Sequence, residues 1–324
     1  MMFLPSPTAE TAARSGPLFV VLNAGSGSHD ADEAQGVMRK VFEEAGRKVE
    51  FFPISSQTPI AQRAAQAVGL AKEQGGVVVA AGGDGTINAV AGAVLGSGCP
   101  FGVLPQGTFN YFGRANAIPQ DTRAAAQALI NASVTPVQVG QVNGKVFLVN
   151  ASLGLYPQLL EDRETWKSQL GRSRVVAFFS GLMTLARHRK QLRLEVELAG
   201  QTANVRTPTL FVGNNHLQLD RVGIDARDAN AVERGELTAI VLKPIGSLAL
   251  FGLLLRGVLG RLGDADNVNS FSFRRLTVRP RGVRRIKVAT DGEIVWMNSP
   301  LVFEVCPKPL LLLVPAPQDR APVE

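Results

Sequence analysis

The first part of the chain alternates short apolar runs with stretches of helical pattern. The apolar runs predict strands at residues 18–22, 49–53, 77–80 and 101–104, and the remaining stretches predict helices at 30–45, 59–73, 86–95 and 122–131. Strands that alternate with helices are typical of βαβ units. We therefore predict an α/β domain with a parallel sheet over residues 1–133, ordered from about residue 17.

The pattern changes after about residue 133 to short alternating runs. Residues 192–198 alternate with a period of two, which indicates a half-exposed strand. Further strands are expected at 137–139, 145–150, 209–213, 236–242, 275–278, 285–289 and 301–306. We predict a mainly-β domain over 134–307, a sandwich or barrel with two inserted helices, and a buried strand at about 308–315 that returns to the first domain. The length of 324 residues also favours two domains, because single domains typically have about 100–200 residues.

A glycine-rich turn, Gly82-Gly83-Asp84-Gly85-Thr86, joins one predicted strand to the next predicted helix. Glycines let the backbone approach a phosphate closely, and the unpaired N–H groups and positive dipole end of the following helix favour an anion there. Asp84 adds an acceptor for a metal ion or a ribose hydroxyl. The alternative is a tight strand-to-helix turn without a ligand.

Three common nucleotide-binding patterns are missing from the sequence. It has no GxxxxGK[ST] loop and no HRD and DFG pair of protein kinases. Its first predicted strand is followed by Asn23-Ala24-Gly25-Ser26-Gly27 and not by a GxGxxG turn. A nucleotide site in this chain is therefore of another type.

A second turn follows the strand 101–104 and contains Gly107, Thr108 and Asn110. In an open parallel sheet, ligands bind outside the carboxyl ends of the strands. We therefore expect both turns, together with Asn23 after the first strand, to line one crevice.

Four motifs in this order resemble the diacylglycerol kinase catalytic-domain family, which includes bacterial lipid kinases and sphingosine kinases. They are the stretch that begins at Asn23, the GGDGT turn at 82–86, the PQGTFN turn at 105–110 and a late Asp291-Gly292-Glu293. The resemblance extends from about residue 18 to about residue 315. It implies a Rossmann-like nucleotide domain, similar to those of NAD kinases and phosphofructokinases, and a mainly-β sandwich domain that binds the lipid substrate.

The resemblance also implies an activity and roles for residues. The activity is transfer of the γ-phosphate of ATP, with Mg²⁺, to a hydroxyl of diacylglycerol or a related lipid. Asp84 would position the magnesium ion, Asp291 would be the general base, and Glu293 would support it through magnesium or a hydrogen bond. The implied nucleotide-binding residues are Asn23, Gly82, Gly83, Asp84, Gly85, Thr86, Gly107, Thr108 and Asn110. Considered without the family, Asp291-Gly292 is a strong hairpin-turn signal.

One stretch departs from the family's pattern. Many bacterial members carry an acidic Asp-Asp-Gly before a strand of the second domain, associated with an additional structural magnesium. The matching stretch here is Glu233-Arg234-Gly235, and the cationic Arg234 would repel a metal ion. The additional site is doubtful, although Asp220, Asp225 or Asp228 could supply ligands nearby.

The net charge of +7 and a pI near 9.8 suit acidic partners. Nucleotide phosphates and anionic membrane surfaces fit this charge. Nucleic acid is disfavoured, because the arginines are scattered and no RNA-binding or helix-turn-helix signature occurs. The alternative is an ordinary basic surface with no specific partner.

Two apolar and basic stretches, 173–190 and 245–262, are shorter than the about 18–20 uninterrupted apolar residues that span a bilayer. They are predicted either as amphipathic helices on a membrane surface or as helices that pack on the sheet. The N-terminus shows no signal-peptide pattern, and the dispersed positions of Cys99, Cys306 and the three histidines argue against a zinc site. We expect a cytoplasmic enzyme that can act peripherally on the inner face of the membrane.

The sequence therefore leaves three candidate functions. The leading one is a lipid kinase that meets its substrate at an anionic membrane surface. A kinase of a soluble acceptor such as NAD is disfavoured by the PxGTxN form of the second turn and by the apolar, basic second domain. A non-catalytic lipid- or nucleotide-binding protein is the third. The acceptor, the nucleotide and the oligomeric state, a homodimer included, stay open.

Overall fold

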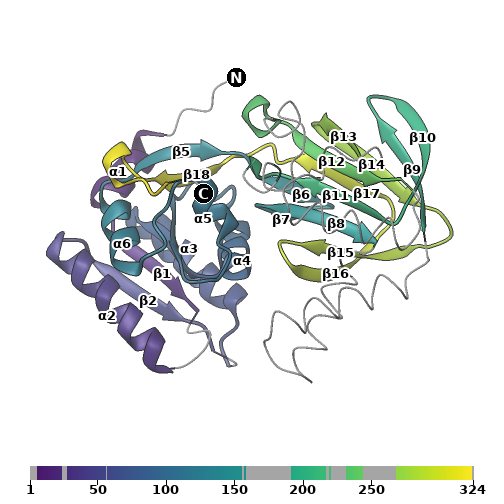
Figure 1. Cartoon of the computed structure of the whole chain (residues 1–324). Coiled ribbons are helices and arrows are strands. Elements are labelled where there is room, and N and C mark those ends of the chain that lie inside the picture. The colour runs from purple at the N-terminus through teal and green to yellow at the C-terminus, as the bar shows by residue number, and fades with distance from the viewer. Residues whose placement is uncertain are drawn as a thin grey trace. The chain divides into compact units, whose positions relative to one another are not determined.

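The computed structural model describes residues 6–23, 28–55, 57–154, 157, 191–216, 219, 231–243 and 268–322, with the backbone alone at 28–31 and 233. The chain divides into two compact units. The first unit contains Met1–Val139 and Cys306–Glu324, and the second contains Gly140–Val305. Each is described separately below, with the element labels of Figure 1.

The first unit is built on a six-stranded sheet with strand order β2-β1-β3-β4-β18-β5. Strands β1 to β4 are parallel, and β18 is parallel to β4 but antiparallel to β5. The strands are β1 Leu18–Leu22, β2 Val49–Pro53, β3 Val77–Gly82, β4 Phe101–Pro105, β5 Ser133–Val137 and β18 Leu310–Val314. The last strand thus lies between two strands that precede it by more than half of the chain.

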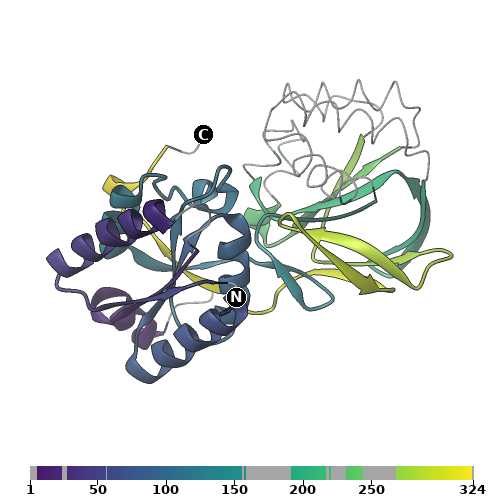
Figure 2. The same ribbon diagram turned by 90° about the horizontal axis from the view of Figure 1, so that it is seen from below.

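Helices cover both faces of this sheet (Figure 2). Helix α2 packs on α6 on one face, and α3 packs on α4 on the other. The helices are α1 Pro7–Ser15, α2 Ser28–Glu44, α3 Ile60–Gln74, α4 Asp84–Val94, α5 Tyr111–Ala115 and α6 Thr122–Ile130, and a 3₁₀ turn follows at Pro317–Asp319. Because both faces are covered, β1, β3 and β4 are buried along their whole length, which explains their uninterrupted apolar sequences.

Helix α1 is anchored by a buried arginine. Arg47 is only 6% exposed, and its guanidinium donates hydrogen bonds to the carbonyl oxygens of Ala12, Ala13 and Gly16 at the end of this helix. The last carbonyl groups of a helix have no partner within it. The carbonyl oxygen of Ala12 also accepts the N–H of Gly16, so the donors of Arg47 matter most for the carbonyl oxygens of Ala13 and Gly16.

The second unit is a sandwich of two six-stranded antiparallel sheets. Their strand orders are β10-β9-β14-β17-β6-β7 and β13-β12-β11-β8-β15-β16. Apolar residues from both sheets form one core cluster, which includes Phe147, Leu210, Leu276 and Phe303. The strands are β6 Gly140–Val142, β7 Lys145–Phe147, β8 Asn150–Gly154, β9 Leu192–Leu198, β10 Gln201–Thr207, β11 Thr209–Gly213, β12 Leu237–Leu242, β13 Val268–Phe273, β14 Arg275–Pro280, β15 Arg285–Thr290, β16 Glu293–Asn298 and β17 Leu301–Val305. A 3₁₀ turn occupies Val232–Arg234.

The predicted fold class, a parallel α/β domain followed by a mainly-β sandwich, is confirmed. The two predicted inserted helices at 173–190 and 245–262 lie outside the described residues. Strands β6, β10, β13 and β16 were missed by the sequence prediction, and the last three are edge strands, while the predicted strand 137–139 shares only Val137 with β5. An edge strand has a neighbour on one side only and can carry polar residues, so its sequence has a weaker apolar signal. Helices α1 and α5 were also missed.

The predicted strand 145–150 is instead two strands, β7 and β8. Between them, the backbone N–H groups of Leu148 and Val149 point to the carboxylate of Asp291. These amides are therefore used outside the sheet ladder, which interrupts the strand.

Candidate functional site

A first candidate site lies where the strand order of the first unit reverses. Strand β1 lies between β2 and β3, so the chain leaves β1 toward one side and β3 returns on the other. Such a reversal opens a crevice at the carboxyl ends of the two strands. Asn23 follows β1 and donates its backbone N–H to the carbonyl oxygen of Ala81, and Gly83 follows β3. Asn23 and Gly83 therefore lie at the same edge of the sheet, at the carboxyl ends of β1 and β3.

The two glycine turns are in close contact. A Cβ atom on Gly83 would lie 3.4 Å from the Cα of Gly107, and one on Gly107 would lie 2.8 Å from the Cα of Gly83. The turns are also joined by a hydrogen bond of 2.9 Å from the backbone N–H of Gln106 to the carbonyl oxygen of Gly82. Glycine is required here because two backbones approach each other closely.

Asn23 and Thr86 position each other. The Nδ2 of Asn23 donates to the Oγ1 of Thr86 over 2.9 Å, and Thr86 is 6% exposed. A Cβ atom on Gly82 would lie 2.7 Å from the Cβ of Thr86. Gly82 thus makes room for the threonine that ties the end of β1 to the start of α4.

Asn110 organises the second turn from inside. It has a positive φ of 49° and is 3% exposed. Its Oδ1 accepts the N–H of Gly107 at 3.0 Å, and its Nδ2 donates to the carbonyl oxygen of Gly107 at 2.9 Å and to Oε1 of Gln120 at 2.8 Å. Thr108 is exposed at the tip of this turn. Asn110 is therefore a positioning residue, whereas Gly107 and Thr108 face solvent.

Asp84 begins α4 and faces the start of α5. Burial raises the pKa of Asp84 above its ordinary value of 3.8, although the backbone N–H groups of Asn110, Phe112 and Tyr111 and the charge of Arg114 act in the opposite direction. Its Oδ1 is buried and has no hydrogen-bond partner among the described residues. A buried carboxylate oxygen that lacks a donor is suited to a cation or a ligand hydroxyl.

A second candidate site, in the second unit, is the turn of the β15–β16 hairpin. Asp291 and Gly292 both have positive φ, 46° and 87°, between the paired Thr290 and Glu293. This is a two-residue hairpin turn of the kind that an Asp-Gly sequence predicts. Asp291 also donates its backbone N–H to the carbonyl oxygen of Asn150 at 2.9 Å.

The carboxylate of Asp291 accepts three backbone hydrogen bonds. Oδ2 accepts from the N–H of Leu148 at 2.7 Å, and Oδ1 accepts from those of Val149 at 2.9 Å and Asn150 at 2.8 Å. An ionised carboxylate is an acceptor only, so three converging donors match that form and fix its orientation. Sequence analysis did not find these donors, because backbone N–H groups carry no side-chain signature.

Glu293 lies on the other side of the same turn and has a different partner. Its Oε2 accepts a hydrogen bond of 3.1 Å from the Nζ of Lys145 on β7, and its side chain is 52% exposed. Asp291 and Glu293 are thus held by separate groups. Close to them in the sheet, the hydroxyls of Ser152 and Thr290 are buried without a hydrogen-bond partner among the described residues.

The stretch that departs from the family's pattern carries an ion pair in place of a carboxylate cluster. The Nε of Arg234 lies 3.3 Å from Oε2 of Glu236. Asp220, Asp225 and Asp228 lie outside the described residues. Within the part of the chain that the structure describes, no three His, Cys, Asp or Glu side chains gather into a metal-binding group.

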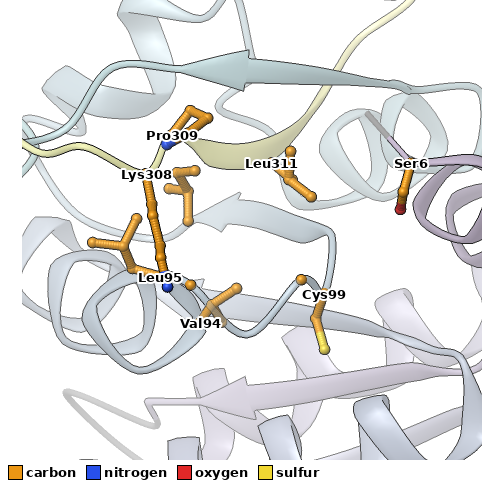
Figure 3. A pocket seen from close by; sticks show the side chains of 10 residues that line it. Ser6, Val94, Leu95, Cys99, Lys308, Pro309 and Leu311 are labelled. Atoms are coloured by element: carbon orange, nitrogen blue, oxygen red, sulfur yellow. The ribbon is translucent and has the colours of Figure 1, made fainter. Parts of the chain in front are cut away.

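A cavity of about 290 Å³ opens in the first unit, near the amino ends of β4 and β18 (Figure 3). Its lining includes Val94, Cys99 and Leu311, and Lys308 extends toward Leu95. The glycine turns lie at the opposite ends of the strands, so this cavity is not part of the candidate site. Lys308 lies close to the end of α4, where a cation interacts favourably with the helix dipole.

No helix in the described ranges combines the length and the apolar character that crossing a bilayer requires.

The sequence of this chain was compared with those of known protein families and proteins. Residues 17–142 match the model of the diacylglycerol kinase catalytic domain. The chain is 36% identical over 129 residues to a diacylglycerol kinase of Bacillus subtilis, covering 39% of this chain and 42% of that protein. It is 28% identical over 218 residues to a diacylglycerol kinase of Staphylococcus aureus, covering 62% of this chain and 67% of the relative.

Two other matches are a curated protein and a solved structure. An uncharacterized protein of Synechocystis is 26% identical over 245 residues, which cover 74% of this chain and 54% of that protein. The crystal structure of a diacylglycerol kinase from Bacillus anthracis superposes with a TM-score of 0.68 at 18% identity, covering 94% of this chain and 98% of the other. The chain spans about half the length of the first two curated relatives. Residues 17–142 thus match the diacylglycerol kinase catalytic domain, which confirms the resemblance indicated by the motifs.

Proposed function

We propose that this protein is an ATP-dependent lipid kinase that phosphorylates a hydroxyl of diacylglycerol or a related lipid at the inner face of the membrane, with Asp291 as general base. One observation carries the proposal. In a chain that matches the diacylglycerol kinase catalytic domain, two glycine turns are in contact at the strand-order reversal, beside a buried carboxylate oxygen of Asp84 that has no donor among the described residues. This arrangement offers backbone amides to phosphates and a carboxylate to a cation in one crevice.

On the nucleotide side, the chain supplies donors and a rigid support. The backbone N–H groups of Gly83 and Gly85 and the exposed hydroxyl of Thr108 bind phosphate oxygens, whereas the N–H of Gly107 already donates to Oδ1 of Asn110. The bond between Asn23 and Thr86 and the contacts of Asn110 with Gly107 hold these donors in place before the ligand arrives. Preorganised donors reduce the ordering cost of binding.

Asp84 is the residue that would hold magnesium. Its buried oxygen without a donor fits an oxygen-seeking cation, and binding would restore the ionised form that burial disfavours. In phosphoryl transfer, magnesium neutralises charge on the phosphate oxygens. Gly83 and Gly85 flank Asp84 and keep the approach to it free of side chains.

On the acceptor side, Asp291 takes the proton of the lipid hydroxyl as the hydroxyl oxygen attacks the γ-phosphorus of ATP, and the bond from this phosphorus to the bridging oxygen breaks so that ADP leaves. The three amides of residues 148–150 orient the carboxylate before the acceptor arrives. The ion pair with Lys145 holds Glu293 at the edge of the turn, from where it supports the base.

The test is transfer of labelled γ-phosphate from Mg-ATP into a total lipid extract and, in parallel, onto NAD. Organic and aqueous products are then separated, with Asp291→Asn as the control. Label in an organic product that disappears in the variant supports a lipid kinase and yields the lipid for identification. Label on NAD contradicts the proposal in favour of a soluble acceptor, and label in neither product favours a binding protein.

A further inference from the structure

The hairpin that carries Asp291 also has an exposed aromatic residue. Trp296 on β16 is 55% exposed, and Val283, just before β15, is 48% exposed. These are two of the three large apolar side chains that are exposed in the described residues. Along β16, Met297 faces the core of the sandwich, so Trp296 faces outward.

Two cations flank the ring of Trp296. The Nζ of Lys287, whose residue pairs with Trp296 across the hairpin, lies 5.3 Å from the ring centroid. The Cζ of Arg285 lies 5.8 Å from the same centroid. Both residues alternate along β15 with Ile286, which packs against the core, so they share the outer face with Trp296.

The exposed arginines at the start of β15 differ from the arginines of the neighbouring sheet in their ion pairing. Arg279 and Arg281 form ion pairs with Glu195 on β9 at 3.7 and 3.3 Å. In contrast, none of the described carboxylates pairs with Arg284 or Arg285, and both arginines are exposed. We call the surface of Val283, Arg284, Arg285, Lys287 and Trp296 the hairpin patch.

We propose that the hairpin patch docks on an anionic phospholipid surface. Indole rings favour the headgroup level of a bilayer, because one edge is polar and the rest is apolar. Lysine and arginine close to an anionic leaflet add electrostatic attraction. A bilayer needs no shape complementarity from its partner, so charge and an exposed indole ring on one face of the hairpin are sufficient.

The position of the patch suits the proposed function, on which this inference rests. Lys287 precedes Asp291 by four residues along the same hairpin, about 13 Å at about 3.3 Å per residue. A docked patch would therefore hold Asp291 near the depth of the lipid headgroups. The hydroxyl of a diacylglycerol lies at that depth, so docking and phosphorylation use the same hairpin.

The first experiment is co-sedimentation of the full chain with phosphatidylcholine vesicles that contain or lack phosphatidylglycerol, at low and high salt. The variants are Trp296→Ala and the double variant Arg285→Gln with Lys287→Gln. The matched control is Arg206→Gln, because Arg206 is an exposed arginine on the distant strand β10 of the same unit.

Each lost charge is expected to weaken binding to anionic vesicles about fivefold, hence about 25-fold for the double variant. Trp296→Ala is also expected to weaken binding to the vesicles, and to do so at high salt as well, where the charges are screened. Arg206→Gln is expected to bind like the wild type. Equal binding of the double variant and the wild type, equal binding to neutral and anionic vesicles, or an equal loss in Arg206→Gln would each overturn the proposal.

A second measurement separates this proposal from the kinase proposal. Phosphate transfer is compared on a short-chain diacylglycerol dispersed in detergent and on diacylglycerol in anionic vesicles. Patch variants are expected to retain transfer in detergent and to lose it on vesicles. If the wild type transfers to no lipid but its vesicle binding depends on the patch, docking stands and the kinase proposal fails. If patch variants act normally on vesicles, docking fails and the kinase proposal stands.

Discussion

Gly83 and Gly107 touch through their backbones, although 24 residues separate them in the sequence. A Cβ atom on Gly107 would lie 2.8 Å from the Cα of Gly83 and 2.6 Å from the Oδ1 of Asn110. Neither neighbour is the end of a flexible side chain, since Asn110 is buried and held by Gln120. The turns after β3 and β4 are therefore one structural unit, and a change in one displaces the amides of both.

Replacing Gly107 by alanine is expected to destabilise the protein by about 1–3 kcal/mol, as overpacking does. It is also expected to abolish the rise in melting temperature on addition of Mg-ATP. The control is Gly69→Ala in α3, where a Cβ atom would meet nothing within 4 Å. That change is expected to stabilise by about 0.5–1 kcal/mol. Urea unfolding and thermal shifts measure both effects, and normal ATP binding by Gly107→Ala would contradict the role of this turn.

Asp291→Asn is expected to lower both activity and stability. An amide nitrogen would replace one carboxylate oxygen and face a backbone N–H of residues 148–150, which leaves a donor without an acceptor. The expected loss of stability is about 1–3 kcal/mol. Glu293→Gln is the comparison, because an ion pair as exposed as that with Lys145 is worth at most about 1 kcal/mol. Equal unfolding midpoints for the two variants would show that the amides do not depend on the charge of Asp291.

The sequence predicts the strands of the parallel sheet well and most edge strands of the sandwich poorly. Strands β1, β3 and β4 are covered on both faces, so their apolar runs are continuous and easy to recognise. Strand β10, with the polar sequence QTANVRT, lies at an edge and has one buried position, Thr207. Its place is decided by pairing with β9 and not by its own composition.

The residues around Asp291 are also only partly predictable from the sequence. The glycine turns are visible in the sequence because only glycine permits such close backbone approach. The amides that hold Asp291 belong to residues 141 to 143 positions earlier in the chain. Backbone donors are present at almost every residue, so only the fold selects which three converge on this carboxylate.

Arg47→Met is expected to destabilise the first unit by about 2–4 kcal/mol, because the carbonyl groups at the end of α1 lose a charged donor while they stay buried. The loss is expected to appear as faster amide hydrogen exchange in α1 with little change in the second unit. Arg63→Met is a matched control, because Arg63 also donates a hydrogen bond to a backbone carbonyl oxygen, that of Pro53, but this bond is exposed to solvent. Unchanged exchange in α1 would show that the helix docks without Arg47.

The pH dependence of stability is expected to reveal the raised pKa of Asp84. Burial raises its pKa above 3.8, so the folded state holds this proton more tightly than the unfolded state does. As the pH rises from 3.8 through the folded-state pKa, the unfolded chain loses the proton first, and stability falls over that window. The cost persists at neutral pH. Asp84→Asn removes it while keeping an oxygen acceptor for the amides of α5.

Asp84→Asn is therefore expected to unfold at higher urea than the wild type near neutral pH, with the difference shrinking as the pH falls toward 3.8. Mg-ATP is expected to reverse the order, because a bound cation stabilises the ionised Asp84 and has no such partner in the variant. The measurement is urea unfolding over this pH range, with and without Mg-ATP. A variant that is less stable at neutral pH would show that the amides of α5 outweigh burial. A variant stabilised by Mg-ATP as much as the wild type would remove Asp84 from the metal site.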